Sequence, residues 1–176
     1  MMGDTPETLL RLGYEARREN RSAAAKAHFA EAIDLCREAS DSGMLARAFC
    51  GLGQIESDLH ETSDALSHYE EAVAIYRTLN DPLVLAHTIR HVGDILRKQG
   101  KFELAAPCYI EALAIYRSNG QAPPLDLANA IRGYALLKGD AGESEEAREL
   151  WQEAGHLYTA VGVEAGAAEA RRRLSL

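Results

Sequence analysis

The sequence predicts an all-α protein built from repeated helical hairpins, and three observations lead to this fold class. The chain of 176 residues is rich in Ala, Glu, Leu and Arg and poor in β-branched residues, a composition that favours helix over strand. The sequence repeats itself with a period near 40 residues. Residues that begin or end helices fall at matching places between apolar runs of three- and four-residue spacing.

The repeat is clearest in columns of residues that recur at the same position. Leu45-Ala46 returns as Leu85-Ala86 and again as Leu127-Ala128, so the two steps are 40 and 42 residues. A column of small residues marks places where helices approach closely, and an aromatic column lies between two columns of alanine. The small residues are Gly13, Gly53, Gly93 and Ala135, and the aromatic ones are Phe29, Tyr69, Tyr109 and Trp151. Four repeats are expected, at about residues 5–41, 44–80, 82–119 and 125–161.

Each repeat is expected to hold two helices. The first helices are predicted at residues 5–19, 44–59, 82–99 and 125–140, and the second helices at 22–40, 62–79, 102–118 and 143–160. Thr5 and Asp81 each precede a proline at a first helical position, and Gly100 and Gly142 suit left-handed helix ends. Pro107 lies near the start of its helix and should tilt that start without breaking it. A last helix at 162–174 should cover the end of the stack.

These columns resemble the tetratricopeptide repeat, although the period is longer than the roughly 34 residues of that family. Repeats of this length are similar to those of kinesin light chains and of bacterial Rap-type and MalT-like regulators. The resemblance implies a single domain over residues 1–176, a right-handed α-α superhelix (alpha solenoid) of four hairpins plus a C-terminal capping helix. Asn20, which replaces a glycine, and Lys138, in an otherwise apolar column, depart from the pattern, so less regular packing is expected there.

The resemblance also implies a protein–protein interaction scaffold whose first helices line a concave groove. Columns spaced three, four and three residues apart lie opposite the core-facing positions, so they are expected to face solvent; they include Glu7, Leu10 and Tyr14. The partner-binding residues expected on this face are Arg47, Gln54, His87, Arg90, Asp94, Arg97, Asn129 and Arg132.

Charge differs between the two sets of helices. The first helices carry nearly balanced charge, whereas the second helices carry a large acidic excess. The four arginines at the expected contact positions could therefore offer forked donors to an acidic or carbonyl-rich segment of a protein or peptide partner. The alternative is that these arginines only keep a helix face solvated.

Other classes of partner are disfavoured. A net charge of -8 and a pI near 5.3 argue against nucleic acid, whose binding needs Lys and Arg to neutralise phosphates. The odd number of cysteines and the absence of a signal-peptide pattern at the N-terminus predict a cytoplasmic protein. No stretch approaches the roughly 18 consecutive apolar residues of a membrane span, so no membrane partner is expected.

No catalytic site, cofactor or metal site is expected. His87 and His91 have a spacing that can bind a metal, but Arg90 between them would repel a cation. The Gly51-Leu52-Gly53 segment resembles the start of a dinucleotide-binding loop, but Glu56 replaces the third glycine and no strand precedes the segment. The sequence therefore predicts a scaffold without enzymatic activity. Self-association, as a structural or regulatory module that forms a homo-oligomer, is the alternative function.

Overall fold

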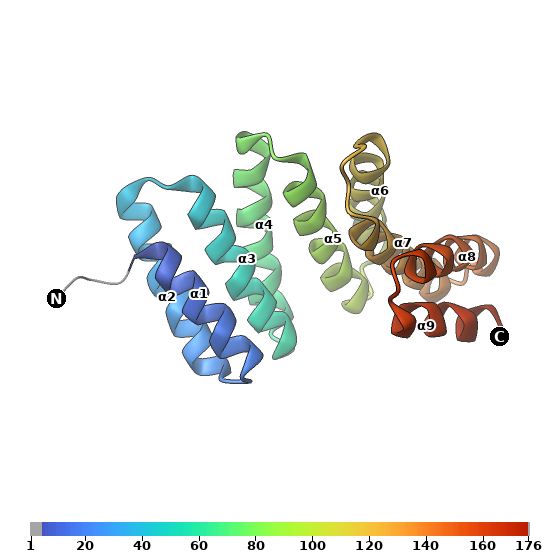
Figure 1. The fold of residues 1–176 in the computed structure, drawn as a ribbon, viewed down its shortest axis with the longest axis horizontal. Coiled ribbons are helices and arrows are strands. Elements are labelled where there is room, and N and C mark those ends of the chain that lie inside the picture. The colour runs from blue at the N-terminus through green and yellow to red at the C-terminus, as the bar shows by residue number, and fades with distance from the viewer. Residues whose placement is uncertain (1–4, 176) are drawn as a thin grey trace. The chain divides into compact units, whose positions relative to one another are not determined.

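The computed structural model describes residues 5–175, and these residues form an all-α helical repeat fold (Figure 1). The chain divides into two compact units, Met1–Asp81 and Pro82–Leu176, so the boundary falls between the second and third predicted repeats. The single domain over residues 1–176 stays a prediction. Within the described residues, no helix combines the length and the apolar character needed to cross a membrane.

The N-terminal unit consists of two hairpins. Helix α1 (Pro6–Arg18) packs against α2 (Ser22–Ala39), and α3 (Ser42–Asp58) packs against α4 (Thr62–Leu79) and also contacts α1 and α2. Thr5 and Asp41 cap the first helices, because their side-chain oxygens accept hydrogen bonds from backbone N–H groups in the first turn. Phe29 and Tyr69 of the aromatic column are buried between the helices.

The C-terminal unit consists of two hairpins and a final helix. Helix α5 (Pro82–Lys98) packs against α6 (Phe102–Ser118), and α7 (Pro124–Asp140) packs against α8 (Ser144–Ala160). Helix α9 (Glu164–Leu174) packs against α8, as predicted for a C-terminal helix. Helix α6 continues through Pro107 without a break. The predicted fold class is confirmed, and every helix ends within two residues of its predicted boundary.

The turns between helices follow one pattern. A residue with positive φ stands in every described turn except the one between α6 and α7; these residues are Asn20, Ser40, His60, Asn80, Gly100, Gly142 and Gly162. After α1, the N–H of Arg21 then donates to the carbonyl of Ala16 at 2.8 Å, which satisfies a carbonyl at the helix end. Irregular packing was expected at Asn20, and that expectation is wrong for the turn, because asparagine tolerates the left-handed conformation that glycine adopts elsewhere.

Glycines let aromatic rings approach the helix backbones. A Cβ on Gly51 would lie 2.4 Å from the Phe29 ring, and a Cβ on Gly133 would lie 2.5 Å from the Tyr109 ring. A Cβ on Gly53 would lie 3.0 Å from Tyr69, in its own hairpin. The interpretation of Gly51-Leu52-Gly53 as a packing element is therefore confirmed.

Candidate partner-binding surface

The expected contact residues fall in both units. Arg47 and Gln54 lie on α3 of the N-terminal unit, and the other six lie on α5 and α7 of the C-terminal unit. The expected contact residues are therefore described separately for each unit.

In the N-terminal unit, the first helices form a pocket of about 310 Å³. Its lining comes from α1 and α3 and consists of Glu7, Leu10, Arg11, Tyr14, Arg18 and Arg47. Arg47 is exposed, as expected for a contact residue, whereas Gln54 is partly buried and does not line the pocket. The expectation that Leu10 faces solvent is wrong: it is among the residues that line the pocket, but only 2% of it is exposed.

The pocket combines an aromatic floor with basic walls. Tyr14 contacts the Phe29 ring edge-on at a centroid distance of 5.0 Å, and burial raises the pKa of its hydroxyl, so the hydroxyl stays protonated near neutral pH. Three arginines face one glutamate in the lining. Arg11 is paired with Glu15 at 2.8 Å, so Arg18 and Arg47 carry most of the uncompensated positive charge. Of the three arginines in the lining, the sequence predicted only Arg47 as a contact residue, because Arg11 and Arg18 lie outside the predicted columns.

In the C-terminal unit, Asp94 is the centre of a hydrogen-bond network rather than a free contact residue. Its carboxylate accepts the Tyr109 hydroxyl at 2.7 Å and the Arg90 guanidinium at 2.8 Å. The Arg90 side chain is only 11% exposed, which contradicts its expected solvent-facing position. Burial of the Tyr109 ring together with the Asp94 charge raises the pKa of the Tyr109 hydroxyl, so it remains a donor. This network ties α5 to α6.

Three more of the expected contact residues have partners within the unit. Arg97 donates to Asp140 at 2.6 Å, and Arg132 donates from Nε and Nη2 to Glu169 at 2.6 and 3.0 Å. Asn129 accepts the Tyr158 hydroxyl at 2.7 Å. With Asp94, four of the expected residues therefore join neighbouring helices, through partners on α6, α7, α8 and α9.

The His87 side chain is 46% exposed, more than those of Arg90, Asp94, Arg97 and Arg132. Its Nε2 lies 3.3 Å from His91 Nε2, and its Nδ1 lies 3.8 Å from Asp126. Burial and the Arg90 charge lower the pKa of His87. Arg90 also lies 2.8 Å from His91, so a positive charge stands beside the ring nitrogens that a metal would need.

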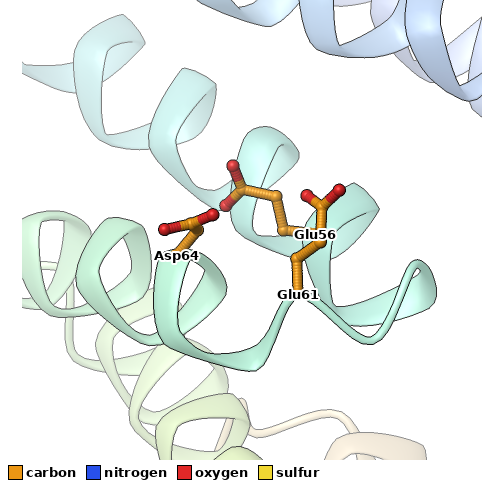
Figure 2. Close-up of side chains that lie close together, drawn as sticks. All are labelled: Glu56, Glu61 and Asp64. Carbon is orange, nitrogen blue, oxygen red and sulfur yellow. The ribbon is translucent and has the colours of Figure 1, made fainter.

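A cluster of carboxylates, which sequence reasoning missed, lies where α3 leads into α4. Figure 2 shows its three members, Glu56, Glu61 and Asp64, and their oxygens converge within 4.8 Å of one another. This acidic cluster is held by bases: Lys26 lies 2.5 Å from Glu61 and 3.8 Å from Glu56, and His68 lies 2.7 Å from Glu56. Glu56 is only 3% exposed.

The fourth repeat uses the same positions differently. Lys138 stands in the column of Glu56, and its ammonium lies 2.5 Å from Glu143 and 2.7 Å from Glu146, which occupy the columns of Glu61 and Asp64. Hydrogen bonds to these two carboxylates raise the pKa of Lys138. The position thus accepts either sign of charge when opposite charges surround it. The acidic cluster is accounted for by the Lys26 ammonium, which has the role of Lys138 in the fourth repeat, and by the close contact of His68 with Glu56.

Comparison with solved structures identifies close fold relatives. BtubC (BKLC) from P. vanneervenii superposes with a TM-score of 0.80 at 20% identity, over 92% of this chain and 68% of that protein. Aspartyl phosphate phosphatase F from Bacillus subtilis gives 0.87 at 17% identity over 97% of this chain, and the apo form of RapI gives 0.88 at 13% identity over 96%. The chain spans 44% and 62% of these two proteins. At such identities the likeness shows the fold alone.

Sequence comparison identifies the family. No curated protein matches the sequence. Tetratricopeptide repeat profiles match residues 4–78 and 85–118, which together make up more than half of the chain. The family supports a protein–protein interaction adaptor in general. The repeat columns, the helical hairpins and these two matches agree, and the chain belongs to the tetratricopeptide repeat family.

Proposed function

We propose that this chain is a non-enzymatic, cytoplasmic adaptor that binds an acidic or carbonyl-rich segment of a partner protein along the first helices of its hairpins. The observation that carries this proposal is the pocket on α1 and α3. Its lining includes residues from two of the columns that the sequence assigns to the contact face: Glu7 and Arg47 share one column, and Tyr14 belongs to another.

The electrostatics of the pocket favour an acidic segment. Arg18 and Arg47 are exposed and stand on neighbouring helices, while Glu7 is the single acid in the lining. A carboxylate of the partner would accept charge-assisted hydrogen bonds from these guanidinium groups, whereas a basic segment would meet like charges. The Tyr14 hydroxyl would add a neutral donor beside them. Acidic character of the partner is therefore the first requirement at this unit.

The C-terminal unit favours carbonyl groups over carboxylates. Arg90, Arg97 and Arg132 already face internal carboxylates, so the net attraction for a further anion is small there. Arg132 nevertheless keeps 39% of its side chain exposed. A guanidinium has five N–H donors, and Glu169 accepts one hydrogen bond from Nε and one from Nη2. Backbone carbonyls of an extended segment suit the donors that remain. His87 offers a further polar contact on the same helices.

The proposal is tested with a panel of unstructured fluorescent peptides that differ only in net charge. Anisotropy at low salt should rank acidic above neutral above basic peptides, and added salt should weaken the acidic complex. The variant Arg18→Glu/Arg47→Glu should raise the Kd of the acidic peptide at least tenfold, equivalent to about 1.4 kcal/mol. Circular dichroism verifies that the fold is kept.

The matched control is Arg37→Glu/Arg77→Glu, which changes the net charge equally but on the second helices α2 and α4. It should leave the Kd within about twofold. Equal weakening by both double variants would mean that only overall charge matters, and the assignment to the first helices would then be abandoned.

A further inference from the structure

The outward face of α6 is unusually apolar for a surface helix. Leu104 and Ile110 are 60% and 54% exposed, more than any other large hydrophobic residue among the described residues. Pro107 and Ala114 are also exposed on this helix. Exposed apolar residues scattered singly need no explanation, but a contiguous group indicates a surface that another molecule covers.

The repeat itself does not require this apolar face. The columns of Leu104, Pro107 and Ile110 are exposed and polar in the second repeat, where they hold Asp64, Ser67 and Glu70, and in the fourth repeat, where they hold Glu146, Glu149 and Gln152. The first repeat has alanines in these columns. Large apolar side chains are thus specific to α6, although the same structural position is satisfied by polar residues elsewhere.

Charged residues frame the apolar face at both ends. Glu103, Pro107, Ile110, Ala114 and Arg117 follow one another at steps of four, three, four and three residues, so they form one stripe along the helix. Glu103 and Arg117 each stand seven residues from Ile110, about 10.5 Å along the axis at 1.5 Å per residue. The α6 stripe therefore has an acid and a base at equal distances from its centre.

We propose that the α6 stripe binds the same stripe of a second copy of this chain, antiparallel about a twofold axis at Ile110. A twofold axis places Glu103 opposite the second copy's Arg117, and Arg117 opposite the second copy's Glu103. Pro107 then faces the second copy's Ala114, so a ring meets a small side chain on both sides of the centre. The stripe is complementary to itself in both charge and size.

Charge favours a second copy as the occupant. Two chains of net charge -8 repel each other in general, but the α6 stripe carries one acid and one base and is locally neutral. Arg117 donates to Glu153 at 2.8 Å, with both side chains about half exposed, and such exposed pairs exchange partners at little cost. A single helix face lies at the small end of specific interfaces, so the dimer is weak and forms only at high protein concentration.

The test is sedimentation of the full chain over a concentration series, with charge reversals at the two ends of the stripe. Glu103→Arg and Arg117→Glu each bring like charges together at both ends, so each should weaken dimerisation at least tenfold. An equimolar mixture of the two variants should form a heterodimer as tight as the parent dimer, because every facing pair is again opposite. The double variant Glu103→Arg/Arg117→Glu should also dimerise.

Two controls carry the same charge changes at equivalent positions of other second helices: Glu145→Arg on α8 and Arg77→Glu on α4. Both should dimerise like the parent, and circular dichroism reports whether every variant is folded. A parent chain that stays monomeric at millimolar concentration overturns the inference. So does a dimer that survives both single reversals, or one that the mixture does not restore.

Discussion

Gly51→Ala perturbs the closest helix–ring contact of the N-terminal unit. The new Cβ would lie 2.4, 2.6 and 2.7 Å from three atoms of the Phe29 ring, all shorter than a carbon–carbon contact of about 3.5 Å. The same three ring atoms lie 2.7, 2.8 and 3.0 Å from the Cβ position of Gly13 on α1, so this edge of the ring has little room to move toward α1. Phe29 is fully buried, so the helices α2 and α3 must move apart.

The sign of the effect follows from two opposing contributions. Replacing glycine by alanine within a helix stabilises it by about 0.8–1.0 kcal/mol. Overpacking a core contact costs about 1–3 kcal/mol, and the confinement of Phe29 on both sides places this site at the upper end. The expected net loss of unfolding free energy is about 1–2 kcal/mol. Gly139→Ala is the matched control: apart from its chain neighbours and its own helix backbone, no atom lies within 4 Å of its Cβ position, so only the gain remains.

Urea unfolding monitored by circular dichroism measures both variants. Gly51→Ala should be destabilised and Gly139→Ala should be stabilised by up to about 1 kcal/mol. Adding Phe29→Leu to Gly51→Ala should cost less than the sum of the two single changes, because the smaller side chain relieves the overlap. If Gly51→Ala proves as stable as the parent, or if the two changes are simply additive, the packing argument is refuted.

Three other outcomes are expected. Tyr109→Ala or Trp151→Ala should each lower the unfolding free energy by about 3–5 kcal/mol in urea melts, since each empties a buried aromatic site. Burial lowers the pKa of His87, so its imidazole binds a proton more readily in the unfolded chain than in the folded one. The unfolding free energy should therefore fall as the pH drops below about 6.5, and in urea melts His87→Asn should show a smaller fall. Lys26→Ser leaves the acidic cluster without an ammonium group and should lower the melting temperature. Lys26→Ser/Glu56→Lys places a lysine where the fourth repeat has Lys138, and it should recover most of that loss in thermal melts.

The helices and the aromatic column could be predicted because they depend on local periodicity. Phe29, Tyr69, Tyr109 and Trp151 are all buried, as their column predicts. The buried charge of Glu56 could also have been found: it shares a column with Leu96, which is buried, and with Lys138, which the sequence marked as unusual. A charged residue in this otherwise apolar column indicated an unusual site in the second repeat as well as in the fourth.

The pairing of the contact arginines could not be predicted in the same way. Arg97 meets Asp140, and Arg132 meets Glu169, across 43 and 37 residues of sequence. The column of a residue indicates which face of a helix it occupies, but not which side chain of the next helix reaches it. Positions that share a face can therefore hold an exposed arginine, such as Arg47, in one repeat and an arginine that is ion-paired across helices, such as Arg97, in another.

The left-handed turns give the two units different internal strain. The N-terminal unit adopts positive φ at Asn20, Ser40, His60 and Asn80, whereas the described residues of the C-terminal unit adopt it only at glycines. A non-glycine residue in this conformation costs roughly 1–2 kcal/mol, less for asparagine. Helices α1–α4 should therefore open more readily than α5–α9, and their amides should exchange with solvent first. None of these turn residues lines the pocket. A substitution at one of the turns can therefore change how readily the N-terminal unit opens without changing any side chain of the pocket.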